Sequence, residues 1–176
     1  MGTEQFGGAK HRRAVPKGRA GAAANDAEAF GLMAGRTLAR LAKQVEWALT
    51  PFELTLPQYR LLALLSDGAA MSSSLAERLA VKPPTVTSVV DGLVTRGLVE
   101  RQPDPTDRRR LPLALTDEGT ALVHSASTAV GTRLFELLDS TDEPATRDAA
   151  SRGLYAWQES LDAHRARLET EKEVAR

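Results

Sequence analysis

The sequence contains no cysteine and three histidines, His11, His124 and His164, which stand far apart. The absence of cysteine excludes disulfides, thiolate metal ligands, cysteine nucleophiles and cysteine redox switches. Because zinc sites are built largely from clustered cysteine and histidine, three separated histidines argue against a zinc site. We therefore expect neither a bound metal nor a cofactor.

Long apolar runs are also missing, since no segment approaches the ~20 apolar residues that a membrane-spanning helix needs. The N-terminus is positively charged but no apolar segment follows it, which argues against a secretory signal. With 42% hydrophobic and 26% charged residues, the composition is that of an ordinary soluble globular protein. We expect a cytoplasmic protein that has no membrane partner.

The 23 basic and 23 acidic residues balance, so net charge alone does not indicate a nucleic-acid partner. Their distribution is uneven, because basic residues gather in residues 1–20 and in the arginine triplet 108–110. Residues 1–24 contain mainly glycine, alanine and basic residues without apolar periodicity, which predicts a disordered arm. Such an arm is either a solvated tail or a source of phosphate contacts.

Two helices are predicted in residues 25–68. The first begins at Asn25 or Asp26, carries apolar residues at helical spacing and stops at Pro51. The second begins near Pro57 and ends by Asp67 and Gly68.

A tight turn joins the next two predicted helices. The third helix begins within the serines 72–74, where Ser74 and Glu77 have the spacing of a capping box and Ser72 is an alternative cap. Consecutive prolines fit only the first turn of a helix, so the fourth helix runs from about Pro83 to Arg96. Two helices joined so tightly form a helix-turn-helix candidate.

The fourth predicted helix has two distinct faces. Its apolar face belongs to the core and comprises Val86, Val89, Val90 and Leu93. The opposite face carries small side chains, with Thr85 at its border, and comprises Pro84, Thr87, Ser88, Asp91 and Thr95. Because solvated helix faces usually carry more Glu and Lys, this pattern favours a DNA-facing surface over a merely solvated one.

Residues 98–119 predict a β-hairpin with a basic loop. Leucines alternate with other residues in segment 111–115, as in a strand with one buried face. Pro112 cannot donate to a strand ladder, which predicts an edge strand. Thr116 fits the N-cap of a following helix, whose first turn is acidic.

Two long helices follow, with a break between Thr141 and Pro144. The last one has apolar positions in alternating three- and four-residue steps, as in a coiled-coil seam. Long amphipathic helices at both ends of the chain most simply bury one another in a dimer. The candidate dimerisation residues are Phe30, Leu154, Trp157, Leu161 and Leu168.

The predicted fold is therefore mainly α-helical with a small β-hairpin wing. The basic arm spans residues 1–24, and a winged helix-turn-helix domain spans residues 51–119. Residues 25–50 and 120–176 form a helical dimerisation region.

This element order resembles that of the MarR family of bacterial winged helix-turn-helix transcriptional regulators, over about residues 26–170. The most specific similarity is the family pattern D-R-R, five residues, L-T-x-x-G, which appears as residues 107–109, 110–114, Leu115-Thr116 and Gly119. The resemblance implies a homodimer that binds double-stranded DNA and is expected to be a repressor. Its recognition helices would enter successive major grooves of a pseudo-palindromic operator, and its wings the adjacent minor grooves.

The resemblance also assigns roles to wing residues. Arg109 matches the arginine that enters the minor groove, and Asp107 matches the aspartate that orients it, as a charge-assisted hydrogen bond would allow. Arg108 and Arg110 complete the candidate wing contacts, and Arg110 is either a phosphate or a structural contact.

On the recognition helix, the sequence departs from the family at three positions. Lys82 replaces the usual Ser or Thr cap, Ser88 replaces a long basic residue, and Gly92 replaces another frequent arginine. The wing and the shape of the DNA should therefore carry more of the recognition. The candidate helix contacts are Lys82, Pro84, Thr85, Thr87 and Ser88.

Family members often release DNA when a small aromatic or anionic ligand binds between the dimerisation helices and the winged module. The resemblance implies that such a pocket would be lined by Trp47, Tyr59, Arg60 and His124. The alternatives are that Trp47 and Tyr59 are core aromatics and that His124 is a surface or interface residue.

Two rival functions belong to other classes. An enzyme is disfavoured, because Asp104 and Asp107 lie on an arginine-rich loop with no nucleophile or histidine nearby in sequence. The alternative function is a helical protein-interaction module whose winged helix no longer binds DNA.

Overall fold

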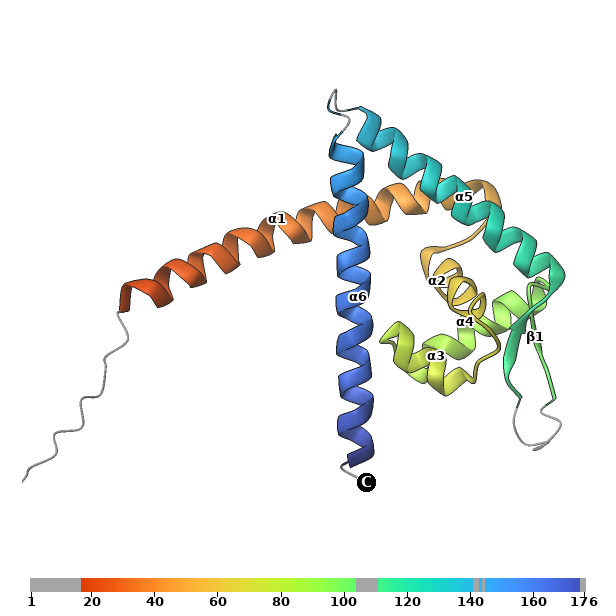
Figure 1. Ribbon diagram of the computed structural model, residues 1–176. Helices are drawn as coiled ribbons and strands as arrows, with labels where there is room; N and C mark the ends of the chain where they lie inside the picture. The colour runs from red at the N-terminus through yellow and green to blue at the C-terminus, as the bar shows by residue number, and fades with distance from the viewer. Residues whose placement is uncertain (1–16, 104–110, 141–142, 144, 175–176) are drawn as a thin grey trace, which may run out of the picture. The chain divides into compact units, whose positions relative to one another are not determined.

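The computed structural model describes residues 17–103, 111–140, 143 and 145–174 (Figure 1). The chain divides into two units, residues 1–40 and 41–176. The described elements confirm a mainly helical fold with a small antiparallel hairpin. In chain order they are α1 (Lys17–Leu49), the 3-10 helix η1 (Thr50–Phe52), α2 (Leu56–Leu65), α3 (Ser72–Leu79), α4 (Pro83–Thr95), β1 (Val99–Arg101), β2 (Leu113–Leu115), α5 (Asp117–Asp139) and α6 (Ala145–Val174).

Helix α1 begins at Lys17, ahead of the expected start at Asn25. The prediction of a disordered arm is therefore wrong for residues 17–24, where four alanines favour the helix enough to offset two glycines. Residues 1–16 of the predicted arm lie outside the described residues. Within the described part of the chain, no helix has the length and apolar character needed to cross a membrane.

The core of the second unit lies among α2, α3, α4, the hairpin and α5, and includes the end of α1. Leu49, Leu61, Leu75, Leu93 and Leu113 are completely buried. The predicted core face of α4 is confirmed except at one position. Val89 is half-buried, because it lies at the margin of that face and packs against the core from its edge.

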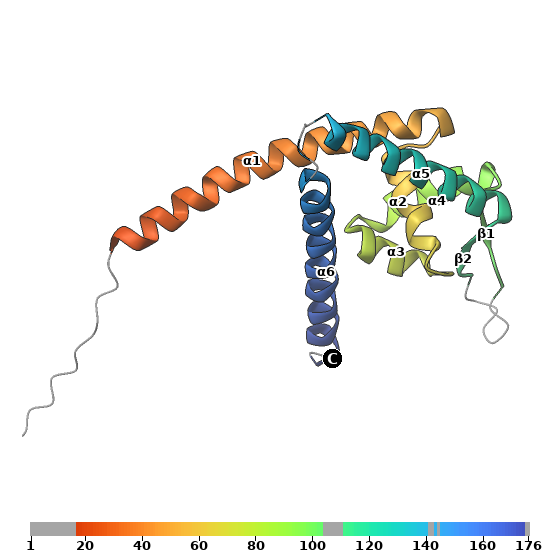
Figure 2. The ribbon, with the colours of Figure 1, turned by 45° about the horizontal axis from the view of Figure 1, so that its top comes forward.

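The hairpin pairs β1 with β2 in antiparallel register, and Figure 2 shows the two strands side by side. Leu113 also exchanges two backbone hydrogen bonds with Ala70, at 3.0 and 2.8 Å. The prediction that β2 is an edge strand is therefore wrong at Leu113, which is paired on both sides. Pro112 precedes the strand, where its missing N–H leaves the ladder intact.

Burial in segment 111–115 is narrower than predicted. Leu113 is fully buried, but Leu115 is only half-buried and Leu111 is 46% exposed. The reason is that regular pairing begins at Leu113, so Leu111 lies outside the ladder that would turn it toward the core.

Helix α3 begins at Ser72, within the predicted serines, but its cap differs from expectation. The N-cap is Met71, in extended conformation, and no side chain caps the helix. Both predicted caps, Ser74 with Glu77 and Ser72, are wrong, because the pairing of Ala70 with Leu113 keeps the chain extended up to Met71. A capping box that was not predicted occurs at α2, where Thr55 and Gln58 bond reciprocally.

Thr116 caps α5 as predicted. Its Oγ1 accepts a hydrogen bond from Gly119 N at 3.0 Å and donates one to Gly97 O at 2.7 Å. The same hydroxyl therefore begins α5 and fastens it to the turn between α4 and β1.

Replacing Thr116 with alanine should lower the free energy of unfolding by ~1–2 kcal/mol, as for loss of a helix cap. Thr116→Ser keeps the hydroxyl and should lose much less. Urea unfolding of both variants measures the difference. If the alanine and serine variants are equally stable, the hydroxyl does not hold this helix start.

Candidate nucleic-acid interface

The predicted contact residues of α4 lie on one exposed surface. Lys82, Pro84, Thr85, Thr87 and Ser88 are all exposed, whereas Val86, Val90 and Leu93 on the opposite face are buried. No long apolar side chain stands on the exposed face, so this helix can approach another surface closely. Its width and side-chain size suit insertion into a major groove.

The missing cap at Lys82 costs little. A helix start normally leaves several N–H groups without partners. Here Pro83 and Pro84 have no N–H, and the next two N–H groups, of Thr85 and Val86, both bond to Lys82 O at 3.0 and 3.4 Å. The lysine side chain has no acceptor and cannot cap the helix; it remains exposed, where it can contact a phosphate.

The hydroxyl groups of α4 have directional roles. Thr87 Oγ1 donates to Pro83 O at 3.2 Å, and Thr95 Oγ1 donates to Asp91 O at 2.8 Å. Each hydroxyl proton is thus used inside the helix, and the oxygen remains an acceptor. In a major groove, such acceptors match the exocyclic amino groups of adenine and cytosine.

Strand β1 of the wing is tied to α4 by an ion pair. Arg101 Nη2 lies 2.8 Å from Asp91 Oδ1, and the two side chains are 45% and 57% exposed. An exposed pair of this kind adds little stability, on the order of 0–1 kcal/mol. It does link β1 to α4, and it neutralises the one carboxylate on the face predicted to meet DNA. Sequence spacing gave no sign of this pair.

The predicted wing-tip contacts Asp107, Arg108, Arg109 and Arg110 lie outside the described residues, as does Asp104. The described ends of the hairpin lead directly into this segment. Gln102 N donates to Pro112 O at 2.9 Å, which closes the base of the loop.

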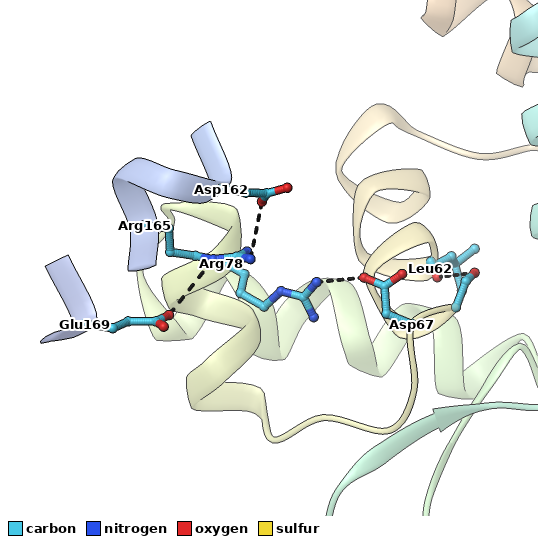
Figure 3. Close-up of polar contacts among 7 residues, drawn as sticks. Leu62, Asp67, Arg78, Asp162, Arg165 and Glu169 are labelled. Atoms are coloured by element: carbon cyan, nitrogen blue, oxygen red, sulfur yellow. Dashed lines mark hydrogen bonds and ion pairs between the residues drawn. The ribbon is translucent and has the colours of Figure 1, made fainter. Parts of the chain in front are cut away.

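A second arginine stabilises the helix-turn-helix from within. Arg78, in the last turn of α3, donates to Asp67 Oδ2 at 2.8 Å, as Figure 3 shows. The Arg78 side chain is 23% exposed and Asp67 is 66% exposed. This pair links α3 to the turn after α2 and reaches neither α1 nor the wing.

The four candidate ligand-pocket residues are not brought together. Tyr59 Oη lies 3.1 Å from Ser127 Oγ on α5, whereas the adjacent Arg60 donates through Nη2 to Leu79 O at the end of α3. Arg60 borders a hollow of about 80 Å³ between α2 and α4. This hollow is too small for a typical ligand, because pockets that bind small molecules have volumes of ~300 Å³ or more. Trp47 and His124 are exposed on α1 and α5. The alternative that Trp47 is a core aromatic is wrong, because its side chain is 53% exposed. The same alternative fits Tyr59, which is half-buried.

The candidate dimerisation residues are exposed in the single chain. Phe30 on α1 belongs to the first unit and is 52% exposed. On α6 the remaining candidates form an exposed apolar series: Leu154, Trp157, Leu161 and Leu168.

A tight helix-turn-helix followed at once by an antiparallel hairpin defines a winged helix-turn-helix protein. Residues 54–111 match the sequence pattern of the family described as the MarR family. The HTH-type transcriptional repressor Rv2887 of Mycobacterium tuberculosis is 33% identical over 120 residues, which cover 68% of this chain and 86% of that protein. This chain belongs to the MarR family, as predicted, and is a transcriptional regulator by class.

Solved structures agree with this assignment. Rv1404 from Mycobacterium tuberculosis is 31% identical with a TM-score of 0.64, over 79% of this chain and 94% of that one. CouR from Rhodococcus jostii RHA1, bound to p-coumaroyl-CoA, is 28% identical with a TM-score of 0.60, over 72% and 88%. CouR bound to a 23-mer DNA duplex is 29% identical with a TM-score of 0.63, over 75% and 94%.

Proposed function

We propose that this protein is a homodimeric repressor that binds a pseudo-palindromic operator in double-stranded DNA, and so acts in the cytoplasm. The observation that carries the proposal is the exposed small-residue face of α4, a helix that packs against strand β1 of the wing and forms an ion pair with it through Asp91 and Arg101. The binding of a DNA duplex by the related CouR supports it.

In this proposal α4 and the wing contact different grooves of the DNA. Thr85, Thr87 and Ser88 meet base edges in the major groove, and Lys82 contacts a phosphate. The short side chains of α4 provide few strong base contacts. Arg109, oriented by Asp107 and flanked by Arg108 and Arg110, therefore supplies much of the affinity from the minor groove.

The exposed apolar residues of α1 and α6 support the homodimer. Each helix leaves large apolar side chains in water, and covering such side chains is favourable by about 25 cal/mol per Å² of apolar surface. A second copy presents the same residues in two-fold symmetry. The dimer would bury Phe30, Leu154, Trp157, Leu161 and Leu168.

We further propose that a small aromatic or anionic ligand releases the DNA. The p-coumaroyl-CoA bound to CouR supports a ligand of this class. Tyr59 and Ser127 join α2 to α5, so a phenol or carboxylate that competes for their hydroxyl groups would act where the two helices meet. Trp47, Arg60 and His124 remain further candidates, although Arg60 faces α3 rather than α5.

Crystals soaked with hydroxylated aromatic acids test the ligand site. We expect electron density within hydrogen-bond distance of the Tyr59 hydroxyl, and Tyr59→Phe should weaken release from DNA. Matched soaks that show no density near any of the four candidate residues would contradict the pocket while leaving DNA binding unaffected.

The exposed apolar series on α6 also favours a second function, a protein-interaction module that no longer binds DNA. Binding to a nonspecific duplex at different salt concentrations separates the two. A DNA-binding dimer that contacts about six phosphates should lose affinity roughly 10³-fold between about 50 and 200 mM salt. Weak binding that hardly changes with salt would support the interaction module and contradict the repressor.

A further inference from the structure

Arg96, the C-cap residue of α4, connects the recognition helix to the segment between α1 and α2. Its Nη1 donates to Glu53 O at 2.7 Å, and its Nη2 donates to Phe52 O at 3.1 Å. The side chain is half-buried. Because both terminal nitrogens are engaged with backbone carbonyls, this guanidinium is placed to hold protein segments together rather than to bind a phosphate.

The segment to which Arg96 bonds follows directly after α1. Leu49 ends α1 and is completely buried, η1 follows, and Leu54 is buried again at 6% exposure. Between them Glu53 has a left-handed backbone, with φ 52° and ψ 36°. A residue other than glycine keeps this conformation only where its surroundings hold it, and the shorter of the two Arg96 bonds is to this residue.

The residues after Arg96 bond to the start of α5, a second helix of the predicted dimerisation region. Gly97 O accepts the Thr116 hydroxyl, and Leu98 O accepts Thr116 N at 3.2 Å. Among the described elements, α4 packs chiefly on α2, α3 and β1. Its C-terminal turn is therefore where it is fastened to the end of α1 on one side and to the start of α5 on the other.

We infer that Arg96 is a positioning residue, which fixes the direction of α4 relative to the end of α1 and thereby sets the distance between the two recognition helices of the dimer. This inference rests on the proposed homodimer. It assigns Arg96 a part in selecting operators by half-site spacing, because that spacing must match the separation of the two helices. Loss of the two bonds would leave α4 packed in its domain but less firmly oriented.

The absence of cysteine provides the test, since Ser88→Cys adds a single exposed attachment point on α4. In the DNA-free protein, pulsed electron paramagnetic resonance between spin labels at this position measures the distance between the two recognition helices. We expect one narrow distance in the Ser88→Cys parent. Adding Arg96→Ala should widen the distribution by several ångströms, and Arg96→Lys, which can replace only part of the two-pronged grip, should widen it less.

Arg78→Ala is the matched control, because it also removes one arginine of this domain but reaches neither α1 nor α5. It should leave the distribution as narrow as in the parent. Distributions of equal width in the parent and both Arg96 variants would overturn the inference alone. A parent without any inter-label distance has no dimer, which would overturn the proposed function and the inference together. If Arg96→Ala does not fold, Arg96→Lys decides the question.

Discussion

Replacing Arg109 with alanine should lower operator affinity on the order of 10- to 100-fold, the cost of an arginine inserted in a DNA groove. Ser88→Ala should cost several-fold less. The reason is the small size of the α4 side chains, which leaves the wing to provide the strong, charge-assisted contact. Asp107 should restrict the arginine before binding, so that less side-chain freedom is lost.

Titration of both variants on one operator at a fixed salt concentration measures this difference. Arg109→Lys serves as a control, because it keeps the charge but cannot reproduce the planar guanidinium. We expect the lysine variant to bind more weakly than the parent and more tightly than the alanine variant. Equal losses in Arg109→Ala and Ser88→Ala would contradict the dominant role of the wing.

Replacing Gly119 with alanine should strongly destabilise the fold. A Cβ atom at this position would lie 2.0 Å from Leu98 O and 2.9 Å from Leu98 C, both backbone atoms that cannot swing away. Relief requires α5 to move from the α4–β1 turn, which Thr116 fastens at Gly97. We expect a loss of about 3 kcal/mol or more, and thus a fall in Tm of about 6–12 °C.

Gly131→Ala is the matched control, since Gly131 lies within the same helix and an added Cβ would have nothing within 4 Å. There the higher helix propensity of alanine should stabilise the protein by ~0.5–1 kcal/mol. Thermal unfolding of the two variants gives opposite signs if the close approach at Gly119 sets the geometry. A neutral Gly119→Ala variant would show that α5 does not depend on this contact.

Local signals were sufficient for the elements that form the interface. The proline pair at residues 83–84 correctly predicted where α4 begins, and Thr116 correctly predicted the start of α5. The polar face of α4 followed from helical spacing alone, since a helix turns by a fixed angle per residue.

Contacts between distant segments explain what the sequence did not predict. The cap of α3 at Met71 and the central position of Leu113 both depend on the pairing of Ala70 with Leu113. The Arg96 bonds to Phe52 and Glu53 join residues more than forty positions apart, and no local pattern marks them. Periodicity and capping rules describe neighbours along the chain, whereas these contacts depend on how the helices pack.

The most direct test of the central claim is to sequence the DNA fragments that the purified protein selects from its own genome. We expect a small set of sites that share a pseudo-palindrome, with half-site centres about one helical turn apart, 10–10.5 base pairs or a multiple of it. Arg109→Ala should select the same sites less efficiently. Fragments without a common sequence or two-fold symmetry would contradict a dimeric repressor that reads an operator.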